Sequence, residues 1–147
     1  MKGHYSNILC VLSDTHRQDD VIAQAVHIAK SHQATLTIML SLESLPPNAN
    51  MVMESFSYID SQSSMETQAQ DWLRNQAEKW EEKYPTQTKV SIGSPLIDII
   101  TNVIKYQYDL VIKRAEESFL DRLFGSLDMR LLRKCPCPVW VLHQKCT

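Results

Sequence analysis

The sequence predicts an α/β fold in which a parallel sheet is covered by helices on both faces. Five short apolar segments occur along the chain, and a stretch whose apolar residues recur at helical spacing lies between each consecutive pair. This alternation of strands and helices is typical of a parallel sheet. The 147 residues are 44% apolar and 22% charged, which suits a single domain over residues 1–147 that folds without a metal or disulfide.

The first strand and the first helix have the clearest patterns. Ile8 to Leu12 form a continuous apolar run, partly β-branched, as in a strand buried on both faces. The run ends at the polar turn Ser13-Asp14-Thr15. From Asp20 to His32 the apolar residues recur at helical spacing, and Asp19 and Asp20 favour the N-terminal end of that helix. Leu36 to Leu42 is the predicted second strand.

The middle of the chain is predicted to hold a long connection, a long helix and a weaker strand. Pro46-Pro47 breaks the chain, and residues 46–64 are expected to form a functional flap or a loosely ordered connection. The helix that follows is closed by Pro85, and Thr86 to Ile92 is the third strand. One face of this helix is marked by a core stripe of Met65, Ala69, Trp72, Leu73, Trp80 and Tyr84.

Two further strands and two helices are predicted in the last third of the chain. Gly93-Ser94-Pro95 begins a helix, with Ser94 as the cap and Pro95 at the first helical position. The strands are Asp109 to Ile112 and Val139 to Leu142, and helical spacing resumes after Gly125-Ser126. The buried stripe expected for the first of these helices is Leu96, Ile97, Ile100, Val103 and Ile104.

Composition excludes several classes of function. The chain has 15 Lys+Arg and 17 Asp+Glu, a net charge of −2, and no basic tract of the kind that nucleic-acid binders carry. Its three glycines, Gly3, Gly93 and Gly125, lie too far apart for a P-loop or a dinucleotide fingerprint. The apolar runs have the length of strands, so neither a signal peptide nor a membrane span is expected. We therefore expect a cytoplasmic protein with reduced cysteines.

The candidate site lies beyond the carboxyl ends of the strands, where the winding of a doubly wound sheet reverses. If the first strand is central, Asp14 faces Lys113 and Arg114 across one crevice. Ser126 is a candidate cap for the following helix, whose N-terminus would receive an anion. The alternative is a solvated loop whose charges only keep this end of the sheet soluble.

Two clusters of metal-ligating residue types have simpler interpretations. If residues 138–142 are extended, His143 lies roughly 16–20 Å from Cys135 and Cys137 at about 3.3 Å per residue, which a tetrahedral site of Cys135, Cys137, His143 and Cys146 does not span. The second cluster, Asp14, His16, Asp19 and Asp20, is interpreted as a loop followed by favourable charges at a helix start. No metal is therefore expected. Cys10, inside an apolar strand, is predicted as a small core residue.

At several segments the chain resembles the universal stress protein family, and the resemblance covers essentially its whole length. The segments are Ile8 to Asp14, Ala23 to Ala29, Ala34 to Leu40, Asp109 to Ile112, Gly125-Ser126 and Leu131 to Val139. The last is the most specific, because it joins a Leu-Leu-Arg helix end to a Cys-Pro-Val strand start. Asp14 to Asp20 with this ending is similar to one half of the tandem E-type members. The resemblance implies a three-layer, doubly wound sheet of order 3-2-1-4-5, like that of the adenine nucleotide alpha hydrolases.

The resemblance also implies a nucleotide site that this chain has changed. Asp14 matches the acid that lines the family's nucleoside pocket, Ser41 falls near its backbone contact to the base, and Gly125 and Ser126 match the residues beside the phosphates. The two glycines of the phosphate motif are replaced by Arg114 and Glu117. Because glycine lets the backbone approach a phosphate closely, ATP binding in the family manner is expected to be weak or absent.

The resemblance thus implies a stress-associated, non-enzymatic regulatory or binding module. The alternative is a stress protein that binds ATP or AMP in a modified phosphate pocket, and a third reading is a small hydrolase that uses Asp14 and His16. No cofactor is expected beyond a weakly held nucleotide or anion. The expected partners are a second copy of the chain and unknown proteins, not a nucleic acid or a membrane. The homodimer is expected to form through the uncharged edge strand Val139, Trp140, Val141 and Leu142.

Overall fold

The computed structural model describes residues 4–15, 18–44, 55–115 and 127–143, and only the helical backbone of residues 55–62. Its sheet has five parallel strands in the order β3-β2-β1-β4-β5, as predicted. The strands are β1 (Asn7–Leu12), β2 (Thr35–Glu43), β3 (Gln87–Gly93), β4 (Leu110–Arg114) and β5 (Val139–Leu142). The described helices are α1 (Asp19–His32), α2 (Ser55–Glu81), α3 (Pro95–Tyr106) and α5 (Leu127–Lys134).

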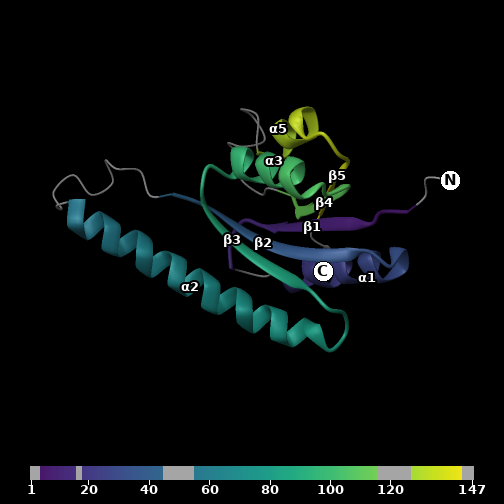
Figure 1. Cartoon of the computed structure of the whole chain (residues 1–147), viewed down its shortest axis with the longest axis horizontal. Coiled ribbons are helices and arrows are strands. Elements are labelled where there is room, and N and C mark those ends of the chain that lie inside the picture. The colour runs from purple at the N-terminus through teal and green to yellow at the C-terminus, as the bar shows by residue number, and fades with distance from the viewer. Residues whose placement is uncertain (1–3, 16–17, 45–54, 116–126, 144–147) are drawn as a thin grey trace.

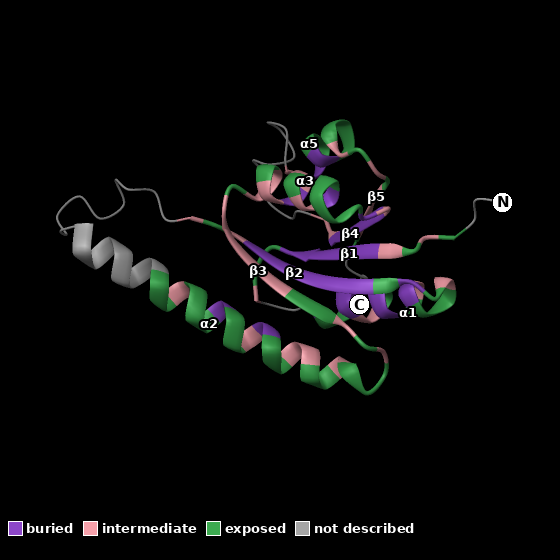
Figure 2. Cartoon of the chain, viewed as in Figure 1, coloured by how far each residue is buried: buried purple, intermediate pink, exposed green. Residues whose placement is uncertain are grey.

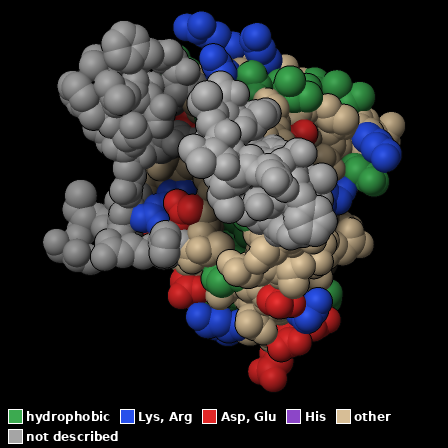
Figure 3. All heavy atoms as spheres, turned by 90° about the vertical axis from the view of Figure 1, so that its left-hand side faces the viewer, with side chains coloured by type: hydrophobic (Ala, Val, Ile, Leu, Met, Phe, Trp, Pro, Cys, Tyr) green, Lys and Arg blue, Asp and Glu red, His purple; other side chains and the backbone are tan. Residues whose placement is uncertain are grey.

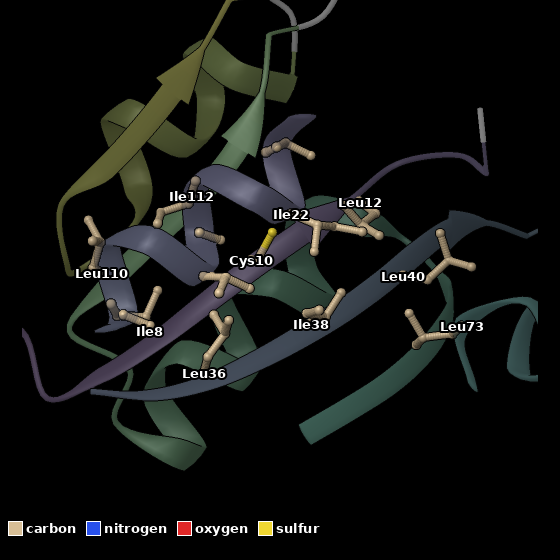
Figure 4. Close-up of a cluster of buried hydrophobic side chains, with 14 of the residues drawn as sticks. Ile8, Cys10, Leu12, Ile22, Leu36, Ile38, Leu40, Leu73, Leu110 and Ile112 are labelled. Carbon is tan, nitrogen blue, oxygen red and sulfur yellow. The ribbon is translucent and has the colours of Figure 1, made fainter. Parts of the chain in front are cut away.

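Helices cover the sheet on both sides, with α1 and α2 on one face and α3 and α5 on the other (Figure 1). Side chains alternate along β1, so that Ile8, Cys10 and Leu12 pack toward α1 and α2. Leu9 and Val11 pack toward α3 and α5. Figure 4 shows the first of these two cores around Cys10. The continuous apolar run of β1 therefore exists because both faces of the strand are covered.

The long helix α2 begins earlier than the sequence predicted. Residues 55–64 were expected within a loose connection, but α2 starts at Ser55 and continues to Glu81. Ala69 and Leu73 anchor this helix to the core, and no glycine or proline interrupts it between residues 55 and 81. Once such a helix is nucleated, each added residue gains one hydrogen bond. The serine-rich residues 55–64 can therefore continue the helix. Residues 46–54 of the predicted connection lie outside the described residues.

The buried face of α3 also differs from the predicted stripe. Ile99 and Val103 are buried, whereas Ile97 and Ile104 are 63% and 64% exposed. Apolar residues occupy most of the circumference of α3, so their spacing alone does not tell which of them face the sheet. Ser94 does occupy the N-cap position, but its side chain makes no capping hydrogen bond.

The remaining predicted elements are confirmed, with shifts at their ends. The burial colours of Figure 2 show β1 and β2 almost wholly buried and β3 only half-buried, as expected for an edge strand. In the described part of the chain, no helix has the length and hydrophobicity that crossing a membrane requires.

The two isoleucines of α3 provide a test of this assignment. Ile99→Ala should lower the free energy of unfolding by about 2–5 kcal/mol, because it removes a fully buried side chain. Ile97→Ala, on the same helix, should change it by less than about 0.5 kcal/mol. Urea denaturation followed by circular dichroism measures both values. Equal losses for the two variants would contradict the observed orientation of α3.

Candidate functional site

A cavity of about 420 Å³ lies between α2 and the carboxyl ends of β1 and β2. This volume falls within the range of about 300–1,000 Å³ that small-molecule sites usually have. Its polar lining comes from Asp14, Thr15 and Gln68. Its apolar walls are Leu42 at the end of β2 and the α2 side chains Met65, Ala69 and Trp72. The described lining residues combine an aromatic and aliphatic wall with a single carboxylate.

The carboxylate of Asp14 is oriented by the start of α1. Asp14 directly follows β1 and the Ser13 turn, and its Oδ1 accepts a hydrogen bond of 2.7 Å from Gln18 Nε2. Gln18 is the buried N-cap residue of α1. The amide therefore fixes one carboxylate oxygen, and Asp14 lies at the predicted place at the end of the central strand.

Lys113 does not contribute its charge to the cavity. Its side chain is 1% exposed, and Nζ donates to Asp128 Oδ1 at 2.5 Å and to the Arg114 carbonyl at 2.8 Å. Asp128 lies in the first turn of α5, so the ion pair joins the end of β4 to the start of that helix. A buried lysine needs a partner of this kind because an isolated ammonium is costly to remove from water. Lys113, one of the two basic residues predicted at the crevice, is thus engaged by the protein's own carboxylate.

The other predicted site residues are dispersed. Ser41 is 2% exposed, and because it alternates with Leu40 and Leu42, whose side chains belong to the core beneath α1 and α2, its hydroxyl faces the α3 side of the sheet. Its backbone, the part predicted to contact a base, directly precedes Leu42 of the cavity wall. Within the described residues, no hydrogen-bond partner is found for Ser41 Oγ. Arg114, half-buried, ends β4 and does not line the cavity. Gly125 and Ser126 lie outside the described residues.

The four residues of β5 form the outer strand of the sheet beside β4, and each is half-buried. Trp140 packs with the α1-side core, and its ring meets Tyr5 edge-on with 5.5 Å between ring centroids. Val139 packs on the opposite core. The backbone edge beyond β5 carries no further strand among the described residues.

The candidate metal residues do not converge in the described structure. Across residues 4–15, 18–44, 55–115 and 127–143, no three His, Cys, Asp or Glu side chains are placed to share an ion. Asp19 instead pairs with Lys79 at 3.2 Å, and His16 and Cys146 lie outside those ranges. Cys10 is a core residue as predicted, and burial raises its pKa to about 12.

Sequence reasoning missed the wall that α2 gives to the cavity. The sequence pattern assigns Met65 and Trp72 to the core stripe, and Trp72 does pack against that core while it also lines the cavity. Gln68, a polar residue, gives no such signal. The length of the stripe could have indicated this wall. The apolar stripe of α2 is longer than the strands that it covers, so the first turns of the helix extend beyond the sheet. The pairing of Lys113 with Asp128 has no local signal, since the two residues are distant in sequence and meet only in the folded chain.

The buried ion pair predicts a large and specific loss of stability. Asp128→Ala should lower the free energy of unfolding by about 3–5 kcal/mol, because it leaves the Lys113 ammonium buried without this carboxylate. The exposed pair of Lys79 and Asp19 is the control, and Lys79→Ala should cost less than about 1 kcal/mol. The double variant Lys113→Met/Asp128→Leu should recover most of the loss. Chemical denaturation measures all three, and equal effects of Asp128→Ala and Lys79→Ala would contradict the buried pair.

This chain is similar in sequence to proteins of one known family. The model of the universal stress protein family matches residues 4–143. The chain is 27% identical over 147 residues to universal stress protein E of Photorhabdus laumondii. The aligned region covers 97% of this chain and 47% of that protein. The chain therefore spans about half the length of the curated relatives it matches.

Solved structures show the same fold. Universal stress protein UspA from Lactobacillus plantarum superimposes with a TM-score of 0.76 and 22% identity, over 95% of this chain and 98% of that one. A universal stress protein solved in complex with cAMP superimposes with a TM-score of 0.68 and 16% identity, over 97% and 99% of the two chains. From the matched family model and the five-stranded sheet with its order 3-2-1-4-5, we conclude that this chain belongs to the universal stress protein family.

Proposed function

We propose that the chain is a non-enzymatic binding module that takes a nucleoside or mononucleotide in the cavity beside Asp14 and holds ATP weakly. The observation that carries this proposal is the lining of the cavity. It joins the indole of Trp72 and aliphatic side chains to the carboxylate of Asp14, and no lysine or arginine is among its described lining residues.

Each part of a nucleoside has a matching surface in this lining. A purine ring is flat and largely apolar, and it would lie against Met65 and Trp72. The sugar hydroxyls are hydrogen-bond donors, and an ionised carboxylate such as Asp14 is a strong acceptor for them. The relative solved with cAMP supports this ligand class.

The polyphosphate of ATP would meet a weaker site. Lys113, which precedes the motif position held by Arg114, is paired with the carboxylate of Asp128. Arg114 and Glu117 stand where the family's motif has glycines, and their side chains would keep the backbone donors from close approach. Losing each such donor costs roughly 1–3 kcal/mol, so two losses would weaken binding about a hundredfold or more.

The non-enzymatic part of the proposal rests on the same lining. Asp14 is the one titratable side chain among the described residues that line the cavity. General acid–base or nucleophilic chemistry usually needs a second group within hydrogen-bond reach of the first. A binding module needs no such second group, because contacts with the ligand are enough to change the surface that it presents to a partner.

The module is further proposed to act as a homodimer through β5. This strand is uncharged and ends the sheet on one side, whereas the opposite edge strand β3 carries Thr88 and Lys89 and is packed against α2. Because the matched relatives are about twice as long, each has room for two such halves in one chain. We propose that a second copy of this chain pairs with it through β5.

Ligand binding is tested by titration calorimetry with adenosine, AMP and ATP. Adenosine and AMP should bind with similar affinity, and ATP should bind no more tightly than they do. Any contribution of the phosphates to the affinity should fall as the salt concentration is raised. Asp14→Asn should weaken adenosine binding about 10–100-fold, since it removes a charged acceptor. Asp71→Asn, an exposed carboxylate elsewhere, is the control. Submicromolar ATP binding that salt does not weaken would show an intact phosphate site and overturn this proposal.

The dimer is tested by analytical ultracentrifugation at micromolar concentration. The chain should sediment as a dimer, and Val141→Lys should shift it to the monomer by placing a charge in the paired edge. Thr88→Lys introduces the same charge at the β3 edge and should leave the dimer intact. A monomeric wild-type chain, or a dimer unaffected by Val141→Lys, would contradict pairing through β5.

A further inference from the structure

Two cysteines outside the cavity lie side by side on the connection between α5 and β5. Cys135 directly follows the last residue of α5, and Cys137 precedes Pro138 and β5. Their sulfur atoms are 3.7 Å apart, and both side chains are half-buried, so they remain reachable from solvent. The proposed ligand site does not use either of them.

The short connection holds the two sulfurs together from both ends. The Cys135 amide donates to the Leu131 carbonyl at 2.8 Å, which ties it to the last turn of α5. The Pro138 carbonyl accepts from the Val111 amide at 3.0 Å, which ties the other end to β4. Pro136 between them restricts its own φ angle. The sulfurs therefore need only approach from 3.7 Å to the bond length of about 2.05 Å.

We infer that Cys135 and Cys137 form a redox-active dithiol that is oxidised by low-molecular-weight disulfides of the glutathione class. The Cys135 thiolate attacks one sulfur of the disulfide, forms a mixed disulfide and releases one thiolate, which takes up a proton. The Cys137 thiol then loses its proton and attacks the Cys135 sulfur. A second thiol leaves, and the Cys135–Cys137 disulfide forms. The dithiol loses two electrons, and the external disulfide gains them.

The surroundings assign the attacking role to Cys135. The hydrogen bond between the two sulfurs is the main cause that lowers the pKa of Cys135, to about 6, against the opposing effect of burial. The same hydrogen bond, burial and the nearby Asp109 raise the pKa of Cys137, which thus keeps its proton until the mixed disulfide has formed. Arg133 and Lys134, exposed in the last turn of α5, bring positive charge to the approach of an anionic disulfide.

Two other uses of the cysteine pair fit the structure less well. A disulfide that closes so short a loop removes little entropy from the unfolded chain, so it would stabilise the fold only slightly. A tetrahedral zinc ion needs four ligands, and no third His, Cys, Asp or Glu is placed to join the two sulfurs among the residues that the structure describes. A strained bond in a small ring is readily reduced again, as a reversible switch requires.

The test uses the chain of 147 residues with Cys146→Ser, so that the cysteine outside the described residues does not react. The protein is reduced, treated with a chelator, desalted and incubated with glutathione disulfide, and free thiols are then blocked with N-ethylmaleimide. Intact mass spectrometry should show the loss of two hydrogens with no bound glutathione, and peptide mapping should place the bond between Cys135 and Cys137. Cys10 should react with N-ethylmaleimide only after denaturation.

Replacing the resolving cysteine traps the first step. Cys137→Ser should accumulate glutathione on Cys135, because no second thiol releases it. Cys137→Ala should accumulate the same adduct several-fold more slowly, since serine retains a hydrogen-bond donor to Cys135 and alanine does not. Two results for the Cys146→Ser protein would overturn the inference. One is a stable glutathione adduct, and the other is that both thiols stay unmodified while a denatured sample reacts. Both of these outcomes are measured without any substitution at the pair.

Discussion

The burial of β1 on both faces is the constraint on which the rest of the structure depends. Its alternate side chains fill two separate cores, so helices must cover each face of the sheet. β2 and β4 pair with its two edges, which places the reversal of the winding at the carboxyl end of β1. Asp14 follows that end, and the start of α1 fixes its carboxylate through Gln18. The position of the site thus follows from the packing of the central strand.

The end of the sheet is divided into two chemically different parts. On the β2 side, α2 extends past the strands and adds an apolar wall to the cavity. On the β4 side, Lys113 is held by Asp128, so a charge that would otherwise attract phosphate stabilises the contact between β4 and α5. In the space-filling view, hydrophobic side chains gather at the top, where Figure 1 places α3 and α5, beside Lys and Arg (Figure 3). The large apolar side chains exposed on these two helices are Ile97, Ile104, Tyr106, Met129 and Leu132.

The fold was predictable from the sequence to a greater extent than the site. Apolar runs such as Ile8 to Leu12, which is short, partly β-branched and followed by a polar turn, favour a strand covered on both faces. α3 was harder, since it is apolar over most of its circumference, and only contact with the sheet and α5 decides that Ile99 is buried while Ile97 is exposed. Asp14 was found because it directly follows a recognisable strand. The sequence suggested a ligand-binding role for Lys113 because it gives no sign of the ion pair with Asp128, which only the tertiary structure brings near.

The central claim is that a nucleoside binds on the β2–α2 side of the sheet end and not beside the neutralised Lys113. Mapping of amide chemical shifts by NMR during an adenosine titration tests it most directly. The largest shifts should fall at Asp14, Leu42 and Ala69 and at the indole N–H of Trp72, while the amides of Lys113 and Asp128 change little. Shifts concentrated at Lys113, Asp128 and the start of α5, with Trp72 unmoved, would contradict it.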